Sequence, residues 1–134
     1  MPARRIALLS ILAFSVSAGA EPRPALKGVS SIRIANYGAP SVLLESREQM
    51  RPLLDELNEV RRKDWRRGEI PVSCYSTVVL MSGKKRVGEF RVTAASIVER
   101  PVEKGQSSYS IALGPGEISH LAGRLAELLP AKCN

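Results

Sequence analysis

The sequence predicts an α+β domain in which an antiparallel sheet of about four to five strands carries two amphipathic helices on one face. Apolar residues recur at helical spacing twice, once before the middle of the chain and once near its end. Between them lie short apolar runs separated by glycine-containing turns, which is typical of antiparallel strands. Packing both helical stripes on one sheet face lets them share a single core. The predicted order is strand, helix, three or four further strands, helix.

The first twenty residues have the layout of an export signal. Basic Arg4 and Arg5 precede an apolar run over 6–16, and Ala18 and Ala20 form an A-x-A cleavage site. As a helix rising about 1.5 Å per residue, this run covers only about half of a hydrocarbon core of about 30 Å. We therefore predict cleavage after Ala20. An N-terminal membrane anchor and a buried first helix are the alternatives.

After processing, one domain is expected to work in the periplasm or as a secreted protein, without a transmembrane segment. Residues 21–28 are rich in proline and charge and are predicted to be a flexible or extended lead-in, so the globular domain is expected over 29–134. The chain has 20 basic and 13 acidic residues. Loss of Arg4 and Arg5 with the leader leaves 18 basic residues against 13 acidic ones, which favours acidic partners or surfaces.

The first element after the lead-in is predicted to be a strand over 30–37. Ile32 and Ile34 alternate with more polar residues there, which is the period of a strand with one buried face. The Gly-Ala-Pro sequence at 38–40 then breaks the strand.

The next segment is predicted to be an amphipathic helix. Its apolar stripe consists of Met50, Leu53, Leu54, Leu57 and Val60. Two signals compete for its start, because Ser46 with Gln49 forms a capping box, whereas Pro52 favours the first helical turn. Cations accumulate toward the other end, where they suit a helix C-terminus, and Gly68 is expected to end the helix.

Two hairpins are expected in the second half of the chain. Apolar runs at 78–80 and 87–92 flank a short turn that contains Gly83, which indicates the first hairpin. A further strand begins at 97–98, and a polar loop over 103–107 follows it. The next run has apolar Tyr109, Ile111 and Leu113 in alternation. This region is a second hairpin or, alternatively, one strand with a wide loop.

The last element is predicted to be a helix entered through Gly-Pro-Gly at 114–116 and ended by Pro130. Its apolar face consists of Ile118, Leu121, Ala122, Leu125 and Leu128. Beyond it lies Cys133, and we predict a disulfide with Cys74, because an even cysteine count in a small exported chain favours one. The bond would close a loop of about sixty residues, worth about 4 kcal/mol in the chain-entropy model. Two separate thiols are the alternative.

Groups for catalysis or metal binding are scarce. The single histidine, His120, is expected to be solvent-exposed, and one helical turn later stands Arg124 rather than a ligand, whereas zinc needs three or four. Motifs for a nucleophile elbow or a phosphate loop are absent. The carboxylates Asp55, Glu56 and Glu59 stand among arginines, where pairing one turn apart explains them. We therefore predict a non-enzymatic protein without a metal or a cofactor.

Two basic segments are the candidate binding surface. The first consists of Arg61, Arg62, Lys63, Arg66 and Arg67 around the only tryptophan, Trp65, and the second consists of Lys84, Lys85 and Arg86 at a hairpin tip. In one interpretation they contact an acidic partner, with Trp65 as an aromatic anchor. In the other, the first segment neutralises a helix end while Trp65 packs inward near Val60, and the second is a solvated turn that blunts a sheet edge.

Another protein of the cell envelope is the expected partner. Nucleic acid is disfavoured, because single-strand binders interleave several aromatic platforms with cations and because export separates the chain from the cell's nucleic acids. In size, export signal and one disulfide, the layout resembles small periplasmic inhibitor and immunity proteins of bacteria. The resemblance implies a domain that occludes an envelope hydrolase or a toxin by surface contact. The alternatives are an accessory envelope protein that binds lipid headgroups or polysaccharide, and a small hydrolase with an unrecognised site.

Overall fold

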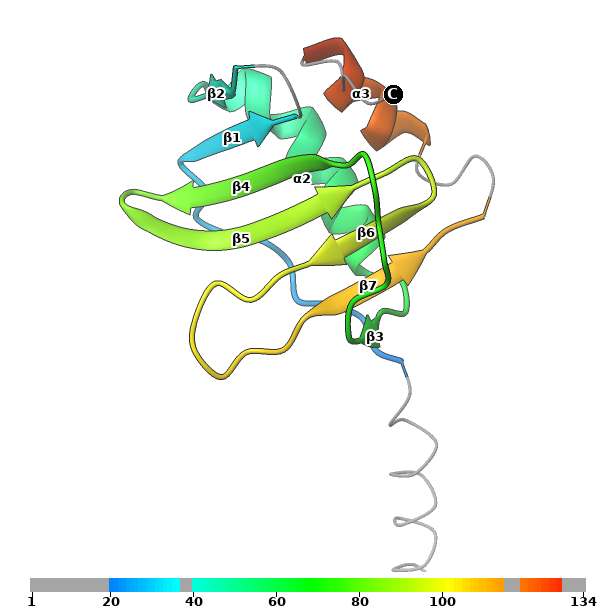
Figure 1. The fold of residues 1–134 in the computed structure, drawn as a ribbon. Helices are drawn as coiled ribbons and strands as arrows, with labels where there is room; N and C mark the ends of the chain where they lie inside the picture. The colour runs from blue at the N-terminus through cyan, green and yellow to red at the C-terminus, as the bar shows by residue number, and fades with distance from the viewer. Residues whose placement is uncertain (1–19, 37–39, 115–118, 129–134) are drawn as a thin grey trace, which may run out of the picture.

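The computed structural model describes residues 20–36, 40–114 and 119–128. Within these residues, one antiparallel sheet has the strand order β2-β1-β4-β5-β6-β7-β3, and two helices pack against it (Figure 1). The strands are β1 (Ser31–Ala35), β2 (Val42–Leu44), β3 (Arg66–Arg67), β4 (Ser76–Ser82), β5 (Lys85–Val92), β6 (Ser96–Glu99) and β7 (Tyr109–Ala112), and the helices are α2 (Arg47–Arg61) and α3 (Ser119–Leu128).

The predicted α+β class and antiparallel sheet are confirmed, whereas the strand count is higher than expected. The two additional strands are the edges of the sheet, β2 and β3, which have three and two residues. Neither is long enough to show an alternating pattern, and β3 is a pair of arginines. Each of them pairs with a longer neighbour, β2 with β1 and β3 with β7. The strand order therefore contains one more strand before α2 and one more after it.

Both helices bury their apolar faces in one core, as predicted. Met50, Leu53, Leu57 and Val60 of α2 are buried with Ile32 and Ile34 of β1. Leu121 and Leu125 of α3 belong to the same cluster. Figure 1 shows α2 along the rear face of the sheet and α3 near the N-terminal half of α2. Leu128, expected on the apolar face of α3, is exposed, and Ile118 and Pro130 lie outside the described residues.

The capping signal determines where α2 begins. Ser46 is the N-cap, and its Oγ accepts the backbone N–H of Gln49 at 3.2 Å. Pro52 therefore lies inside the helix rather than in its first turn. The expectation that Gly68 ends the helix is wrong, because α2 ends at Arg61. The residues after it leave the helix because Trp65 and β3 form strand-like pairs with two other segments.

Both predicted hairpins are present. β4 and β5 pair through a turn at Gly83 and Lys84, and Gly83 has φ 63°, a value that glycine adopts at little cost. A positive φ at the first turn residue is what a two-residue type II′ hairpin requires. β6 and β7 form the second hairpin, with Ser96 opposite Ala112 at its open end. The loop between them, residues 100–108, extends away from the core (Figure 1).

Residues 21–26, which we call the strap, are extended and hydrogen-bonded along the end of α2. Glu21 and Trp65 each donate a backbone N–H to the other's carbonyl at 2.9 Å. The N–H of Arg23 donates to the carbonyl of Arg61 at 2.7 Å. The last carbonyls of a helix have no donor within it, and the strap supplies one here. Residues 1–19 of the predicted leader lie outside the described residues.

Residues 68–75, the crossing segment, run from β3 at the sheet edge to β4 in its middle. In Figure 1 this segment passes in front of β6 and β7, over the face opposite α2. Its anchor is Glu69, whose carboxylate accepts the hydroxyl of Ser108 at 2.7 Å and lies within 4.0 Å of Arg91 and Arg100. In the part of the chain that the structure describes, no helix is long and apolar enough to cross a membrane.

Candidate functional site

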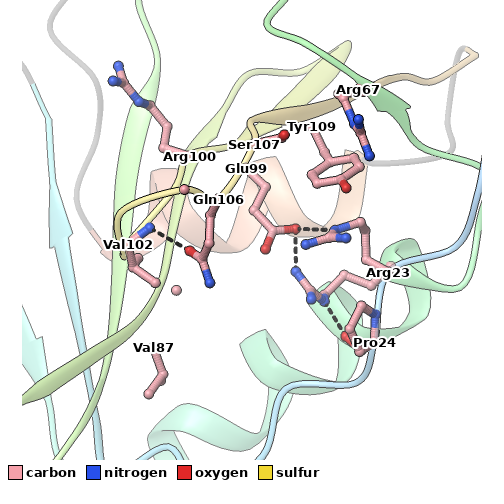
Figure 2. A pocket seen from close by; sticks show the side chains of 13 residues that line it. Arg23, Pro24, Arg67, Val87, Glu99, Arg100, Val102, Gln106, Ser107 and Tyr109 are labelled. Carbon is pink, nitrogen blue, oxygen red and sulfur yellow. Dashed lines mark hydrogen bonds and ion pairs between the residues drawn. The ribbon is translucent and has the colours of Figure 1, made fainter.

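A cavity of about 410 Å³ lies between the strap, the end of α2 and the 100–108 loop (Figure 2). Its size is within the range of small-molecule sites. The charged and aromatic side chains that face it are Arg23, Arg61, Arg67, Glu99 and Tyr109, and we call it the arginine cavity. Arg100 also borders it, but its side chain turns away from the other arginines toward Glu69, 3.7 Å distant.

The register of the second hairpin places the two central groups of this cavity. Ile97 of β6 pairs with Ile111 of β7, and both side chains belong to the core. Glu99, two residues after Ile97, pairs with Tyr109, two residues before Ile111. Because side chains two residues apart share a face of a sheet, these polar residues continue the core-facing row. They lie where α2 has already ended, so no helix covers them.

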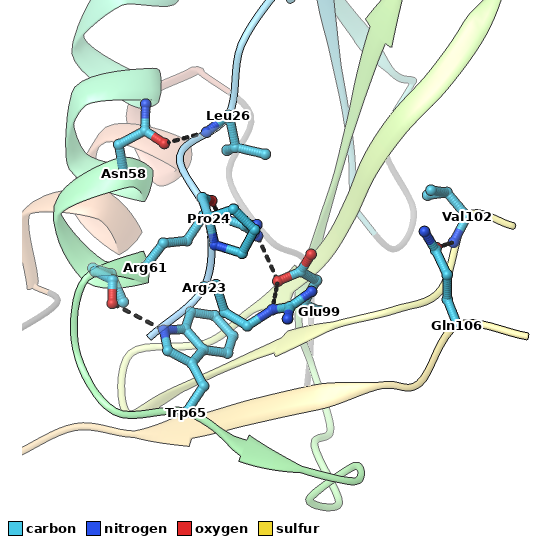
Figure 3. Close-up of polar contacts among 10 residues, drawn as sticks. Arg23, Pro24, Leu26, Asn58, Arg61, Trp65, Glu99, Val102 and Gln106 are labelled. Carbon is cyan, nitrogen blue, oxygen red and sulfur yellow. Dashed lines mark hydrogen bonds and ion pairs between the residues drawn. The ribbon is translucent and has the colours of Figure 1, made fainter. Parts of the chain in front are cut away.

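Glu99 is held by two arginines that come from different segments. Its Oε1 accepts a hydrogen bond from Nε of Arg23 at 3.1 Å and another from Nη1 of Arg61 (Figure 3). Nε of Arg61 donates to the carbonyl of Pro24 in the strap at 2.6 Å. The side chains of Arg61 and Glu99 are only 5% and 12% exposed. A carboxylate that two guanidiniums share at such burial is fixed in position.

Tyr109 lies between two guanidiniums at the mouth of the cavity. The guanidinium carbon of Arg23 is 3.7 Å from the ring centroid, and that of Arg67 is 6.0 Å from it. Both distances are within the range of cation–π contacts. Arg67 is exposed and makes no ion pair with any residue that the structure describes. The cavity therefore has three guanidiniums facing it against the single carboxylate of Glu99.

Gln106 shapes the rim of the cavity and was missed by the sequence analysis. Its Oε1 accepts the backbone N–H groups of Val102 at 3.0 Å and Glu103 at 3.1 Å. These bonds fix the loop, and Figure 2 shows the amide nitrogen of Gln106 on the cavity side. A single glutamine in a polar loop gives no signal in the sequence. Glu99 does carry a signal, because it lies two residues after Ile97 in the same strand and therefore on the same, core-facing side.

The structure divides the first basic segment. Trp65 is fully buried, and its Nε1 donates to the carbonyl of Val60 at 2.9 Å, so the interpretation of Trp65 as an exposed anchor is wrong. Arg61 is buried as well. The exposed members of this segment are Arg62, Lys63, Arg66 and Arg67. A helix stripe continued by one turn from Leu57 reaches Arg61, which explains why its side chain turns inward.

The two basic segments lie on either side of the arginine cavity. Lys84, Lys85 and Arg86 are exposed at the tip of the β4–β5 hairpin, far from β3 in Figure 1. They precede Val87, which lines the cavity, and Arg67 of β3 lines it from the opposite side. Lys85 also contacts the 100–108 loop, with its Nζ 3.3 Å from the Glu103 carboxylate.

Other groups singled out in the sequence lie elsewhere. Glu56 of α2 pairs with Arg124 of α3, and this hydrogen bond and its charge raise the pKa of Arg124. The side chain of His120 and all of Cys133 lie outside the described residues, so the predicted disulfide stays a prediction. Cys74 is exposed before β4 with φ 56° and is not a free thiol. Among the described residues, no group of three His, Cys, Asp or Glu side chains could hold a metal ion.

Comparisons with known proteins give no relative: no family model, no curated protein and no solved structure matches this chain. A function for this chain therefore rests on its own geometry. The arginine cavity offers convergent hydrogen-bond donors and a local excess of positive charge. Such an arrangement binds anionic groups.

Proposed function

We propose that this protein is an exported, non-enzymatic binding domain that contacts another protein of the cell envelope, as an inhibitor or immunity protein of a hydrolase or toxin does. The observation that carries the proposal is the arginine cavity with exposed cations on both sides. The cavity presents donors and positive charge for holding a ligand. Export itself is proposed from the layout of residues 1–20.

A network of hydrogen bonds around the cavity supports a binding role. The strap is hydrogen-bonded to α2, Arg61 is bonded to both the strap and Glu99, and Gln106 fixes the loop. Groups that are already held in place lose little conformational entropy when a partner binds. Exposed cations around this network attract an acidic partner over distance and raise the association rate. Both properties suit an inhibitor that must capture its target quickly.

Affinity capture from envelope extracts at low salt tests this proposal. The double variant Arg66→Glu with Lys85→Glu changes one exposed cation in each basic segment. The matched control, Arg33→Glu with Arg51→Glu, makes the same change in net charge at two exposed positions outside these segments. We expect one stoichiometric protein partner with the original chain and with the control, and markedly less with the double variant. Recovery of no partner at low salt would contradict the proposal.

The second candidate is an accessory envelope protein that holds an anionic surface such as lipid headgroups or polysaccharide. The observation that favours it is the exposed hairpin tip, whose three cations require no cavity to make contact. Diffuse charge binding fades as the Debye length contracts from about 10 Å at 0.1 M salt to about 3 Å at 1 M, whereas a packed interface loses less. Cosedimentation with anionic vesicles across this salt range separates the two functions.

A further inference from the structure

We infer that the arginine cavity recognises an acidic peptide segment, and that Arg67, at the side of Tyr109, makes the first contact with its carboxylates. This inference rests on the proposed function and names the chemistry of the partner. The site differs from an exposed basic surface, because Arg23, which lies outside both basic segments, is only 20% exposed and Arg61 is buried. The recognition site is a recess, not a charged surface.

Hydrogen-bond donors converge at the mouth of this recess. Arg67 makes no ion pair with the described residues, so its guanidinium is available to a ligand. Arg23 uses its Nε for Glu99, which leaves its two terminal nitrogens beside the Tyr109 ring. The amide nitrogen of Gln106 lies on the same side in Figure 2. Guanidinium groups in such an arrangement can each offer two parallel N–H donors.

The charge of the recess matches more than one carboxylate. Glu99 neutralises one of the three guanidiniums that face the cavity, so two positive charges remain. Glu99 also shows that this set of arginines accommodates a planar carboxylate. Arginine is suited to bidentate recognition of that group, which a lysine cannot reproduce. Two acidic side chains from one segment would complete the neutralisation.

A peptide fits the surroundings of the recess better than a small anion does. The exposed cations of the hairpin tip directly precede Val87, which lines the cavity, and Arg67 of β3 lines it from the opposite side. A small ion would fill only part of a cavity of about 410 Å³, whereas an acidic chain can cross the recess from Arg67 toward Val87 and the hairpin tip. A flat membrane would contact the exposed cations but not the partly buried Arg23.

Titration of the purified chain with acetyl-tetraglutamate amide, followed by backbone amide NMR shifts, tests the inference. We expect saturable shifts at Val102, Gln106 and Tyr109, and none with tetraglutamine amide. Arg67→Gln should weaken peptide binding about tenfold, the effect of one lost charge-assisted contact. The matched control Arg33→Gln removes an exposed cation from β1, far from the 100–108 loop in Figure 1, and should change the affinity by less than about twofold.

Each of the remaining outcomes contradicts the inference. Equal losses in Arg67→Gln and Arg33→Gln would indicate diffuse charge binding. Shifts confined to the hairpin tip would place the peptide outside the recess. Tighter Arg67-dependent binding of inorganic phosphate would assign the recess to small phosphates, and binding only to phosphatidylglycerol vesicles would assign the cations to a membrane. If a partner is captured but keeps its affinity for Arg67→Gln, the inference is wrong while the proposed function stands.

Discussion

Arg61 and Glu99 are charged residues at positions where the helix and strand periodicities predict burial. Arg61 continues the helical row of Leu53 and Leu57, and Glu99 continues the strand row of Ile97. A periodic pattern predicts an apolar residue at each of these two positions, so a charged side chain there requires a partner of opposite sign. Each residue alone indicates an ion pair, but the sequence does not say that they meet, because 38 residues separate them.

Glu99→Gln should destabilise the fold. The substitution keeps the shape of the side chain but leaves the guanidiniums of Arg23 and Arg61 without their shared carboxylate. Removal of one partner from a buried pair costs about 3 kcal/mol, at the low end of the usual range because this cavity opens to solvent. Urea unfolding, followed by the fluorescence of the buried Trp65, measures the loss.

Glu103→Gln is the matched control for that substitution. Glu103 pairs with Lys85, and both side chains are more than half exposed. The same chemical change there should alter the free energy of unfolding by less than about 0.5 kcal/mol, because exposed ion pairs contribute little. Equal effects of the two substitutions would show that the Glu99 network has no special role in stability.

At the level of elements, periodicity predicts the helices and the longer strands and misses the short edge strands. The apolar stripes of α2 and α3 and the alternation of β1 and β7 identify these elements from the sequence. β3 could not be found, because two arginines carry no period. Its formation also decides the end of α2, so the expected stop at Gly68 was wrong for the same reason. Local patterns give the long elements, whereas the two short edge strands depend on backbone pairing with a neighbour, even though β2 buries Leu44 in the core.

The strap depends on a side chain of α2 that no pattern singles out. Oδ1 of Asn58 accepts the backbone N–H of Leu26 at 2.7 Å (Figure 3). Asn58→Ala should lower the free energy of unfolding by about 1–2 kcal/mol, because a partly buried N–H loses its acceptor. Faster amide hydrogen exchange at Leu26 should accompany this loss. Glu59→Ala, at an exposed neighbouring position of α2, is the control and should leave the exchange at Leu26 unchanged.

For the whole molecule, the arginine cavity arises at the end of the sheet that α2 leaves uncovered. α2 covers one face only as far as Arg61, and the crossing segment covers the opposite face. The strap and the 100–108 loop then enclose the space beyond α2. The residues that line it come from segments far apart in the sequence, and the hydrogen-bonded pair Arg23 and Glu99 is 76 positions apart. Composition predicts basic surface segments, but only the fold shows that they border a recess.

The predicted processing and disulfide can be tested together by intact mass. Chain recovered from the cell envelope should begin at Glu21 and weigh two hydrogens less than its reduced form. Cys74 supports the disulfide, because it is not a free thiol. Its backbone has φ 56°, a region where glycine is the usual residue. Cys133→Ser leaves that backbone untouched and should lower the free energy of unfolding by about 4 kcal/mol. Chemical reduction of the original chain is the control and should cost a similar amount. A full-length mass with two reactive thiols would place this chain in a different compartment and remove the basis for an envelope partner.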